Sequence, residues 1–321
     1  MGGTVAVAIQ AENLVKEYKG GVRALDGLSL EVEAGTVFGL LGPNGSGKTT
    51  TVRILTTVAA PDTGSASVLG FDVVRQPEEV RTRIGLAGQF AAVDENLSGL
   101  ENLRMIGQLN QLTRTSAKLR ANELLEVFEL TGAAKRSVKT YSGGMRRRLD
   151  LAAALVNSPP VLFLDEPTTG LDPYSRQSLW QVIEELVAGG TTVLLTTQYL
   201  EEADRLAKMI AVMDQGRMIA QGTPAQLKAG LGASVVELEM KSAADAHLVG
   251  EAIRSRGNGS IRVEDTKVEI PLEGGPTQLR WLFDVMSEVS CEPHGFSLRE
   301  PSLDDVFLSL TGHQAEEGRM G

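Results

Sequence analysis

The sequence of 321 residues is poor in cysteine and histidine. Cys291 is the one cysteine, and the three histidines all lie after residue 246. One cysteine cannot form a disulfide within the chain, and it cannot build a cysteine-rich zinc site. Because residues 1–246 contain no histidine, a histidine base and a histidine metal ligand are excluded from that part of the chain.

Long hydrophobic runs and an excess of positive charge are missing as well. No stretch approaches the 18 apolar residues that suggest a membrane-spanning helix, and the N-terminus shows no signal-peptide pattern. Asp and Glu outnumber Lys and Arg by 41 to 31, which gives a net charge of −10. A surface for duplex nucleic acid needs the opposite sign, so no nucleic-acid partner is expected. With its single cysteine, the chain is expected to be intracellular.

Hydrophobic residues make up 42% of the chain and charged residues 22%, which is typical of globular proteins, and the length suggests two domains. Short apolar runs predict buried strands at residues 36–41, 161–164 and 192–195. Apolar residues at helical spacing predict amphipathic helices between them. Strands that alternate with helices indicate an α/β domain with a parallel sheet, residues 1–230. A helical subdomain, about residues 96–157, is inserted in it.

The pattern changes after Gly230. Residues 231–312 follow the order β-α-β-β-α-β and then add a helix. This order predicts a small ferredoxin-like α+β domain, the split βαβ sandwich. Residues 313–321 are short and polar, and they are predicted to be a disordered tail.

A glycine-rich segment, GPNGSGKT at residues 42–49, fits G-x-x-x-x-G-K-[ST] and lies between a predicted strand and a predicted helix. Its glycines let consecutive N–H groups point at phosphate oxygens, and the helix adds its positive end. Lys48 would reach the β- and γ-phosphates, and the Thr49 hydroxyl would hold Mg²⁺. A glycine-rich turn without a ligand is the alternative, which the flanking elements disfavour. The residues expected to bind ATP here are Gly42, Pro43, Asn44, Gly45, Ser46, Gly47, Lys48, Thr49 and Thr50.

Two acidic residues, Asp165 and Glu166, follow the apolar run at residues 161–164. An acid at the end of a buried strand, beside a phosphate loop, can hold Mg²⁺. The next acid is placed to polarise a water molecule that attacks the γ-phosphate. The alternative is a strand that ends in a solvated turn, and the phosphate loop favours the catalytic interpretation.

The segment YSGGM at residues 141–145 resembles the signature loop of ABC-transporter ATPase subunits. Ser142 is a predicted helix N-cap, and Gly143 and Gly144 follow it. Helix N-termini attract phosphate, so this segment could bind the γ-phosphate of a nucleotide held by a second copy. An ordinary capped helix is the alternative. From about residue 8 to 227 the motifs follow the family order, which implies a P-loop ATPase of ABC type with an antiparallel β region.

The resemblance assigns further positions. Tyr18 stands where the family has an aromatic residue that stacks on adenine, with a core or surface tyrosine as the alternative. Gln89 looks like the glutamine that contacts Mg²⁺ and the attacking water, and Asp172 resembles the loop that links the two sites of a dimer. Gln198 replaces the family's switch histidine; it can donate a hydrogen bond but cannot carry a proton near pH 7. The residues implied for catalysis are Lys48, Gln89, Glu166 and Gln198; for Mg²⁺, Thr49, Gln89 and Asp165; and for ATP outside the phosphate loop, Tyr18, Ser142, Gly143, Gly144 and Asp172.

Two features follow the signature glycines. Met145 departs from the usual glutamine of the family, so a polar role of that side chain is not expected. Three consecutive arginines, residues 146–148, are expected to form a solvated basic face, with a partner contact as the alternative.

Three longer strings, at residues 139–150, 196–200 and 303–312, are similar to the bacterial drug-export subgroup that includes the daunorubicin/doxorubicin resistance ATPases. The resemblance implies an ATPase at the cytoplasmic face of the bacterial membrane. It would form a homodimer around two MgATP and drive a separate integral-membrane permease for drug efflux.

Other functions stay open at this point. Gln198 is compatible with a nucleotide-binding regulator that hydrolyses ATP weakly, and the exported molecule could be a lipid or another endogenous compound. ATPases that act on DNA or the ribosome are disfavoured by the acidic charge, the short gap before the signature segment and the single cassette. Residues 231–312 would sense the nucleotide state, support the dimer or contact the permease, or they would only add stability.

Overall fold

The structure is a computed structural model that describes residues 6–88, 93–230, 234–256, 261–272 and 276–311. By its internal contacts the chain divides into two compact units, residues 1–221 and residues 222–321. The sequence placed the boundary later, at Gly230. The structure groups α8 (Pro224–Ala229) with the second unit, where it packs against α11 (Leu303–Thr311). The predicted tail, residues 313–321, lies outside the described residues.

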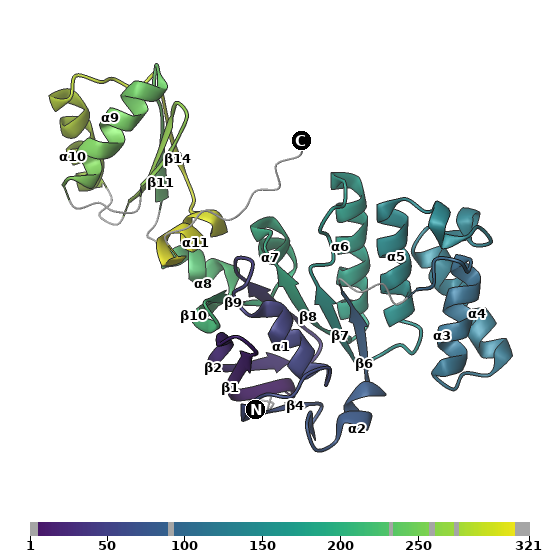
Figure 1. Ribbon diagram of the computed structural model, residues 1–321. Helices are drawn as coiled ribbons and strands as arrows, with labels where there is room; N and C mark the ends of the chain where they lie inside the picture. The colour runs from purple at the N-terminus through teal and green to yellow at the C-terminus, as the bar shows by residue number, and fades with distance from the viewer. Residues whose placement is uncertain (1–5, 89–92, 231–233, 257–260, 273–275, 312–321) are drawn as a thin grey trace, which may run out of the picture. The chain divides into compact units, whose positions relative to one another are not determined.

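A six-stranded sheet forms the centre of the first unit, in the order β10-β9-β3-β8-β7-β6 (Figure 1). The pairs β9/β3, β3/β8, β8/β7 and β7/β6 are parallel, and every residue of β3, β7 and β8 is buried. Strands covered on both faces read as continuous apolar runs, which confirms the three predicted strands. The strand bounds are β3 (Val37–Leu41), β6 (Ile84–Ala87), β7 (Val161–Asp165), β8 (Thr192–Thr197), β9 (Met209–Asp214) and β10 (Arg217–Gly222).

An antiparallel sheet, in the order β2-β1-β4-β5, is the second layer of this unit. Helix α1 (Lys48–Leu55) contacts strands of both sheets and buries Val52, Ile54 and Leu55 in their common core. Each of these side chains contributes about 1.5–3 kcal/mol by leaving water. The start of α1 is thereby fixed at the end of β3. The strand bounds are β1 (Val7–Tyr18), β2 (Val22–Glu33), β4 (Thr63–Val68) and β5 (Phe71–Asp72).

Helices between β6 and β7 form a cluster at one side of the first unit (Figure 1). The first begins with a capping box, in which the Ser98 N–H donates to Glu101 Oε2 at 2.8 Å and Ser98 Oγ accepts from the Glu101 N–H at 3.3 Å. These elements occupy the stretch predicted as a helical subdomain. They are α3 (Gly99–Leu109), α4 (Arg114–Val127), η1 (Thr131–Ala133), η2 (Val138–Thr140) and α5 (Gly143–Ala154), and the other helices of the unit are α2 (Pro77–Arg81), α6 (Pro173–Ala188) and α7 (Leu200–Leu206).

The second unit contains a four-stranded antiparallel sheet in the order β12-β13-β11-β14. This order, with a helix after β11 and another after β13, is the ferredoxin-like arrangement expected from the sequence. Helices α9 and α10 pack against apolar side chains of the sheet in one core cluster. The bounds are β11 (Ser234–Glu239), α9 (Ala243–Arg254), β12 (Arg262–Glu264), β13 (Lys267–Leu272), α10 (Pro276–Glu288) and β14 (Gly295–Arg299).

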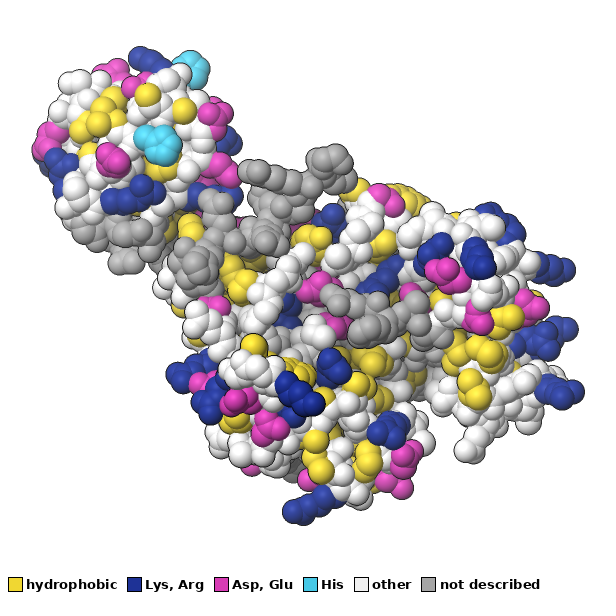
Figure 2. All heavy atoms as spheres, in the orientation of Figure 1, with side chains coloured by type: hydrophobic (Ala, Val, Ile, Leu, Met, Phe, Trp, Pro, Cys, Tyr) yellow, Lys and Arg dark blue, Asp and Glu magenta, His cyan; other side chains and the backbone are white. Residues whose placement is uncertain are grey.

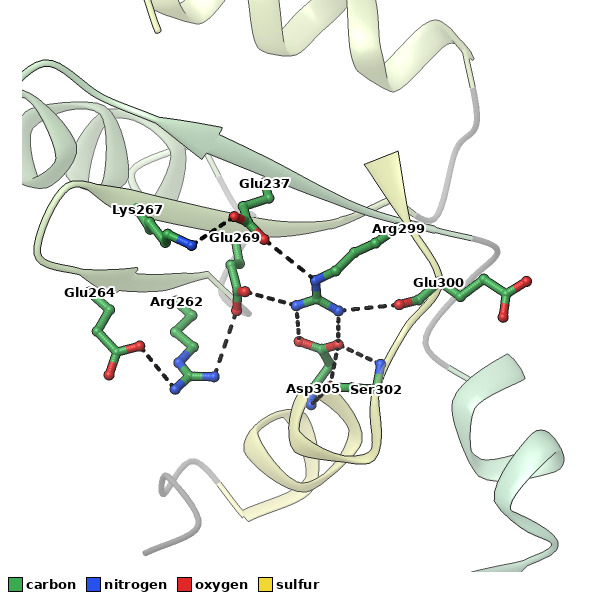
Figure 3. A network of polar contacts seen from close by, with 9 residues as sticks. All are labelled: Glu237, Arg262, Glu264, Lys267, Glu269, Arg299, Glu300, Ser302 and Asp305. Carbon is green, nitrogen blue, oxygen red and sulfur yellow. Dashed lines mark hydrogen bonds and ion pairs between the residues drawn. The ribbon is translucent and has the colours of Figure 1, made fainter. Parts of the chain in front are cut away.

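Charged side chains of this sheet form a network that reaches helix α11 (Figure 3). The Arg299 guanidinium donates to both oxygens of Asp305, at 2.7 and 3.1 Å, and lies 2.9 Å from Glu269. Hydrogen bonding to Asp305 raises the pKa of Arg299, although burial opposes this. A bidentate pair of this kind holds α11 to the end of β14.

The surface of the molecule carries side chains of both charges. In the view of Figure 2, acidic and basic side chains are interspersed, and the visible histidine side chains lie on the second unit. None of the described helices combines the length and the hydrophobicity that crossing a membrane requires.

The Glu202 carboxylate is fully buried in the first unit. Glu202, on α7, is 0% exposed, and the Trp180 indole Nε1 of α6 donates to its Oε1 at 3.1 Å. Burial raises the pKa of Glu202, while the nearby Thr197 and Thr168 hydroxyls and the Trp180 indole act in the opposite direction. The protonated form is therefore favoured in the folded state more than in the unfolded chain.

We expect Glu202→Gln to remove a pH-dependent loss of stability. Above the unfolded pKa of about 4.3 the folded unit binds more protons than the unfolded chain, so the wild-type free energy of unfolding falls as pH rises toward the folded pKa. The variant keeps an acceptor for Trp180 but does not titrate. Its free energy of unfolding, relative to wild type, should therefore increase as the pH rises above about 5.

Denaturant unfolding of the variant and the wild type checks this. The readout is Trp180 fluorescence in a Trp281→Phe background, so that the signal comes from the first unit alone. A difference between variant and wild type that stays constant over this pH range would contradict the prediction.

Candidate functional site

The glycine-rich segment at residues 42–47 joins β3 to α1. Gly47 is the N-cap of α1. Because it has no side chain that could accept a hydrogen bond from the first N–H groups of the helix, these groups are available to an anion. A Cβ on Gly42 would lie 2.4 Å from the Met213 carbonyl oxygen, and Gly47 has φ +106°. Ser46 Oγ is buried, and no described residue provides it with a hydrogen-bond partner. The loop therefore has the shape and the donors of a phosphate site.

Lys48 lies over this loop and is only 4% exposed. Its Nζ donates to the carbonyl oxygens of Gly42, at 2.7 Å, and Pro43, at 3.0 Å, and lies 3.7 Å from Glu166 Oε1. Burial lowers the pKa of Lys48, and the charges of Glu166 and Asp165 oppose that shift. The ammonium is thus placed between the loop and the two acids.

Thr196, in the middle strand β8, connects the two acids. Its Oγ1 donates to Asp165 Oδ1 at 2.5 Å and accepts from the Glu166 N–H at 3.1 Å. Thr196 is fully buried and directly opposite Asp165 in the β7/β8 register. The sequence did not lead us to predict a role for Thr196. The feature that could have indicated one is a hydroxyl side chain near the end of a mainly apolar strand.

Asp165 and Thr49 provide two oxygens suited to Mg²⁺. Thr49 Oγ1 lies 3.2 Å from Asp165 Oδ1, close to the spacing of about 2.9 Å between adjacent ligands in an octahedral Mg²⁺ shell. No group of three or more His, Cys, Asp or Glu side chains suited to a metal occurs among the described residues. Mg²⁺ beside phosphates needs only one or two carboxylates, so the pair fits it. Gln89, the third predicted ligand, lies outside the described residues.

Glu166 has an unusual backbone, with φ +50°, in the left-handed region that few non-glycine residues adopt. Its side chain is buried and accepts from Thr169 Oγ1 at 3.4 Å. A cavity of about 410 Å³ lies beside it and extends to Gly143 at the start of α5. The residue with the strained backbone therefore lines an open space that extends to the signature segment.

The signature segment and Asp172 both begin helices. Ser142 Oγ accepts from the Met145 N–H at 3.2 Å as the N-cap of α5, and Gly143 is exposed. Asp172 is the N-cap of α6, where its two oxygens accept from the N–H and the hydroxyl of Ser175, at 2.9 and 2.7 Å. These hydrogen bonds lower the pKa of Asp172.

Comparisons with known proteins agree with this geometry. Residues 25–169 match the family model described as ABC transporter. The chain is 53% identical over 311 residues to the daunorubicin resistance ATP-binding protein DrrA2 of Streptomyces coeruleorubidus, and the match covers 96% of each chain. This chain belongs to the ATP-binding subunits of ABC transporters. It is therefore an ATPase, and the predicted fold and family are confirmed.

Two more similarities extend the comparison. This ABC ATPase is 49% identical over 320 residues to the daunorubicin/doxorubicin resistance ATP-binding protein DrrA of Streptomyces peucetius, covering 97% of this chain and 94% of that one. A solved ATP-binding cassette, described as a dimer in a post-hydrolysis state bound to ADP and Pi, is 26% identical with a TM-score of 0.63. That match covers 67% of this chain and 98% of the cassette.

In this ABC ATPase, the contacts between described residues bring together only some of the residues predicted for the site. Lys48, Thr49, Asp165 and Glu166 form one group. Tyr18 ends β1 and is half-buried, with Lys16 Nζ 5.8 Å from its ring centroid. The remaining predicted residues lie at other positions: Gln198 directly after β8, Ser142 to Gly144 at the start of α5, and Asp172 at the start of α6.

The arginines after the signature glycines correct an expectation. Arg146 pairs with Glu95 at 2.9 Å and Arg148 with Glu129 at 3.1 Å. Arg147 instead points inward, and burial lowers its pKa. A solvated face is therefore wrong for Arg147. Its guanidinium donates to the carbonyl oxygens of Gly88, Asp165, Glu166 and Pro167. The feature that could have predicted this orientation is its position, because Arg147 lies four residues before the buried Leu151 and therefore on the same helical face.

We expect Gly42→Ala to abolish high-affinity nucleotide binding. The added Cβ would also lie 2.6 Å from Ser46 Oγ, so the loop must shift, at a cost of about 1–3 kcal/mol in stability. The measurements are the thermal midpoint and the Kd of a fluorescent ATP analogue.

The matched control is Gly132→Ala, where an added Cβ meets no heavy atom within 4 Å. It should leave both quantities unchanged. Wild-type affinity in Gly42→Ala would show that the loop does not need this close approach.

Proposed function

We propose that this chain is the ATP-hydrolysing subunit of a bacterial drug exporter, in which two copies clasp two MgATP and drive a separate membrane permease. The observation that carries the proposal is the group of Lys48, Thr49, Asp165 and Glu166 at one edge of the parallel sheet. It brings together the cation, the hydroxyl and the two carboxylates that phosphoryl transfer to water requires. The names of the two daunorubicin relatives support the substrate class.

Lys48 binds the phosphates in this proposal. Its ammonium rests on two neutral carbonyl oxygens, of Gly42 and Pro43. Phosphate oxygens carry full charge and form stronger hydrogen bonds with a buried ammonium than carbonyl oxygens do. The β- and γ-phosphates therefore replace the two carbonyls, and the N–H groups at the start of α1 complete the site.

Mg²⁺ fits beside these phosphates. Thr49 Oγ1 and Asp165 Oδ1 would hold it, and Thr196 keeps the Asp165 carboxylate in place through its hydroxyl. Bound there, the ion would neutralise charge on the β- and γ-phosphate oxygens.

Glu166 acts as the general base. When Lys48 turns to the phosphates, its ion pair with Glu166 is released, and a carboxylate oxygen can accept a proton from water. The water oxygen then bonds to the γ-phosphorus as the bond to the ADP oxygen breaks. Gln198, at the end of β8, donates a hydrogen bond to the γ-phosphate but carries no proton.

A second copy completes each site. The exposed Gly143 at the capped start of α5 is accessible to a ligand that this chain's own phosphate loop does not hold. A helix start of this kind binds an anion such as the γ-phosphate of a nucleotide held by another copy. The related cassette solved as a dimer supports this arrangement. Nucleotide binding thus closes the pair, and hydrolysis removes the contacts that hold it closed.

The permease supplies the pathway for the drug. We place the ATPase at the cytoplasmic face of the cell membrane, where its closing and opening would move an integral-membrane partner. Residues 231–312 would sense the nucleotide state, support the dimer or contact the permease. Gln198 in place of a histidine favours a second candidate function, a nucleotide-binding regulator with slow hydrolysis, which ATPase assays with and without the permease distinguish.

Glu166→Gln should lower kcat for ATP by at least about 100-fold, because an amide does not accept the proton of the attacking water. Gln198→Ala should cost less, about 10-fold, since it removes one hydrogen bond to a charged group. Phosphate release gives kcat, and binding of a fluorescent ATP analogue shows that both variants keep their nucleotide affinity.

Glu129→Gln is the matched control, because Glu129 is exposed and pairs with Arg148 in the helical cluster. It should hydrolyse ATP at the wild-type rate. Near-normal turnover in Glu166→Gln would refute the role of this carboxylate.

Drug export is tested in a drug-sensitive bacterium that expresses the chain with the membrane protein that co-purifies with it. Cells with the wild-type chain should retain less daunorubicin, measured by its fluorescence, than cells with Glu166→Gln. Equal retention would contradict daunorubicin-type drugs as the substrate and leave the ATPase assignment intact.

A further inference from the structure

One guanidinium group in the first unit connects three separate parts of the site. Arg147 lies four residues after Gly143, on the turn of α5 that follows the signature segment. Its Nη1 donates to the carbonyl oxygen of Gly88, just after β6, at 2.6 Å. Its Nη2 and Nε donate to three consecutive carbonyl oxygens at the end of β7 and directly after it, those of Asp165 at 2.9 Å, Glu166 at 2.6 Å and Pro167 at 2.7 Å.

These contacts act on the backbone of the strained residue. Glu166 has φ +50°, and its N–H donates to Thr196, to the carbonyl oxygen at 3.0 Å and to Oγ1 at 3.1 Å. Arg147 holds the carbonyl groups before, at and after Glu166. The peptide groups on both sides of the carboxylate are therefore fixed, and so is the direction of its side chain.

Only an arginine can make this set of contacts. A guanidinium carries five N–H donors in a rigid planar fork, and the four carbonyls approach it along its three nitrogens. A lysine ammonium offers three donors from a single atom, and glutamine offers two. Arg147 also lines the cavity that extends from Glu166 to Gly143, together with Arg146 and Asp150.

We propose that Arg147 is a positioning residue that fixes the Glu166 carboxylate to the helix of the signature segment, so that a shift of α5 alters the geometry of water activation in the same chain. This inference rests on the proposed function, because it assumes that Glu166 activates the water. In the dimer, the start of α5 would contact the nucleotide of one site while Glu166 acts at the other. Arg147 thereby makes hydrolysis in one site depend on occupancy of the other.

The test compares Arg147→Gln and Arg147→Lys with the control Arg148→Gln in the full-length protein. Arg148 is the next residue, but it donates to Phe128 O at 3.3 Å and Glu129 within the helical cluster. Arg147→Gln should keep the Kd for MgATP within about twofold, since the phosphate loop is untouched. Its kcat should fall about 100-fold, the effect of misplacing a catalytic group by about 1 Å. Arg147→Lys, which keeps the charge, should fall at least about 10-fold.

Each outcome is decisive. Wild-type kcat in Arg147→Gln, or full recovery in Arg147→Lys, would overturn the positioning role. Equal losses of MgATP binding and turnover, with a lowered thermal midpoint, would assign Arg147 to stability alone and also overturn it. An inactive wild-type protein would overturn the proposed function as well, whereas an active wild type with an active Arg147→Gln overturns only this inference.

Discussion

In a parallel sheet the carboxyl ends of neighbouring strands meet at one edge, and backbone hydrogen bonds hold them about 4.8 Å apart. Here β3, β8 and β7 are adjacent, and each is followed by a segment of the proposed site. The phosphate loop follows β3, Gln198 follows β8, and Glu166 follows β7. Parts of the chain more than a hundred residues apart in sequence are thereby brought within ion-pair distance, as Lys48 and Glu166 show.

Buried polar contacts fix the conformation of a residue that lies at this edge of the sheet. The left-handed backbone at Glu166 costs about 1–3 kcal/mol, and such strain persists only where the surroundings hold it. Thr196 accepts a hydrogen bond from the Glu166 N–H and Arg147 donates to the Glu166 carbonyl oxygen. A hydrogen bond from a charged group such as this guanidinium contributes about 1.5–3 kcal/mol. The structure thus stabilises an unfavourable conformation at the carboxylate that accepts the proton of the water in the proposed hydrolysis.

Features carried by short contiguous segments could be predicted from the sequence. The buried strands, the phosphate loop and Ser142 as an N-cap depend on residues within a few positions of one another, and the structure has each of them. Thr196 and Arg147 could not be predicted in the same way, because their partners come from other strands and loops. A run of three arginines is commonly solvated, and only the packing of α5 against β6 and the loop after β7 turns the middle one inward. The position of the unit boundary likewise depends on a contact between α8 and α11, which are far apart in sequence.

The most direct measurement is the mass and nucleotide content of Glu166→Gln in solution, by sedimentation with MgATP and with MgADP. If each ATP is clasped between the phosphate loop of one copy and the signature segment of another, MgATP should produce a dimer that retains two nucleotides, and MgADP should leave monomers. A protein that stays monomeric at saturating MgATP, while still binding one nucleotide per chain, would contradict the shared site.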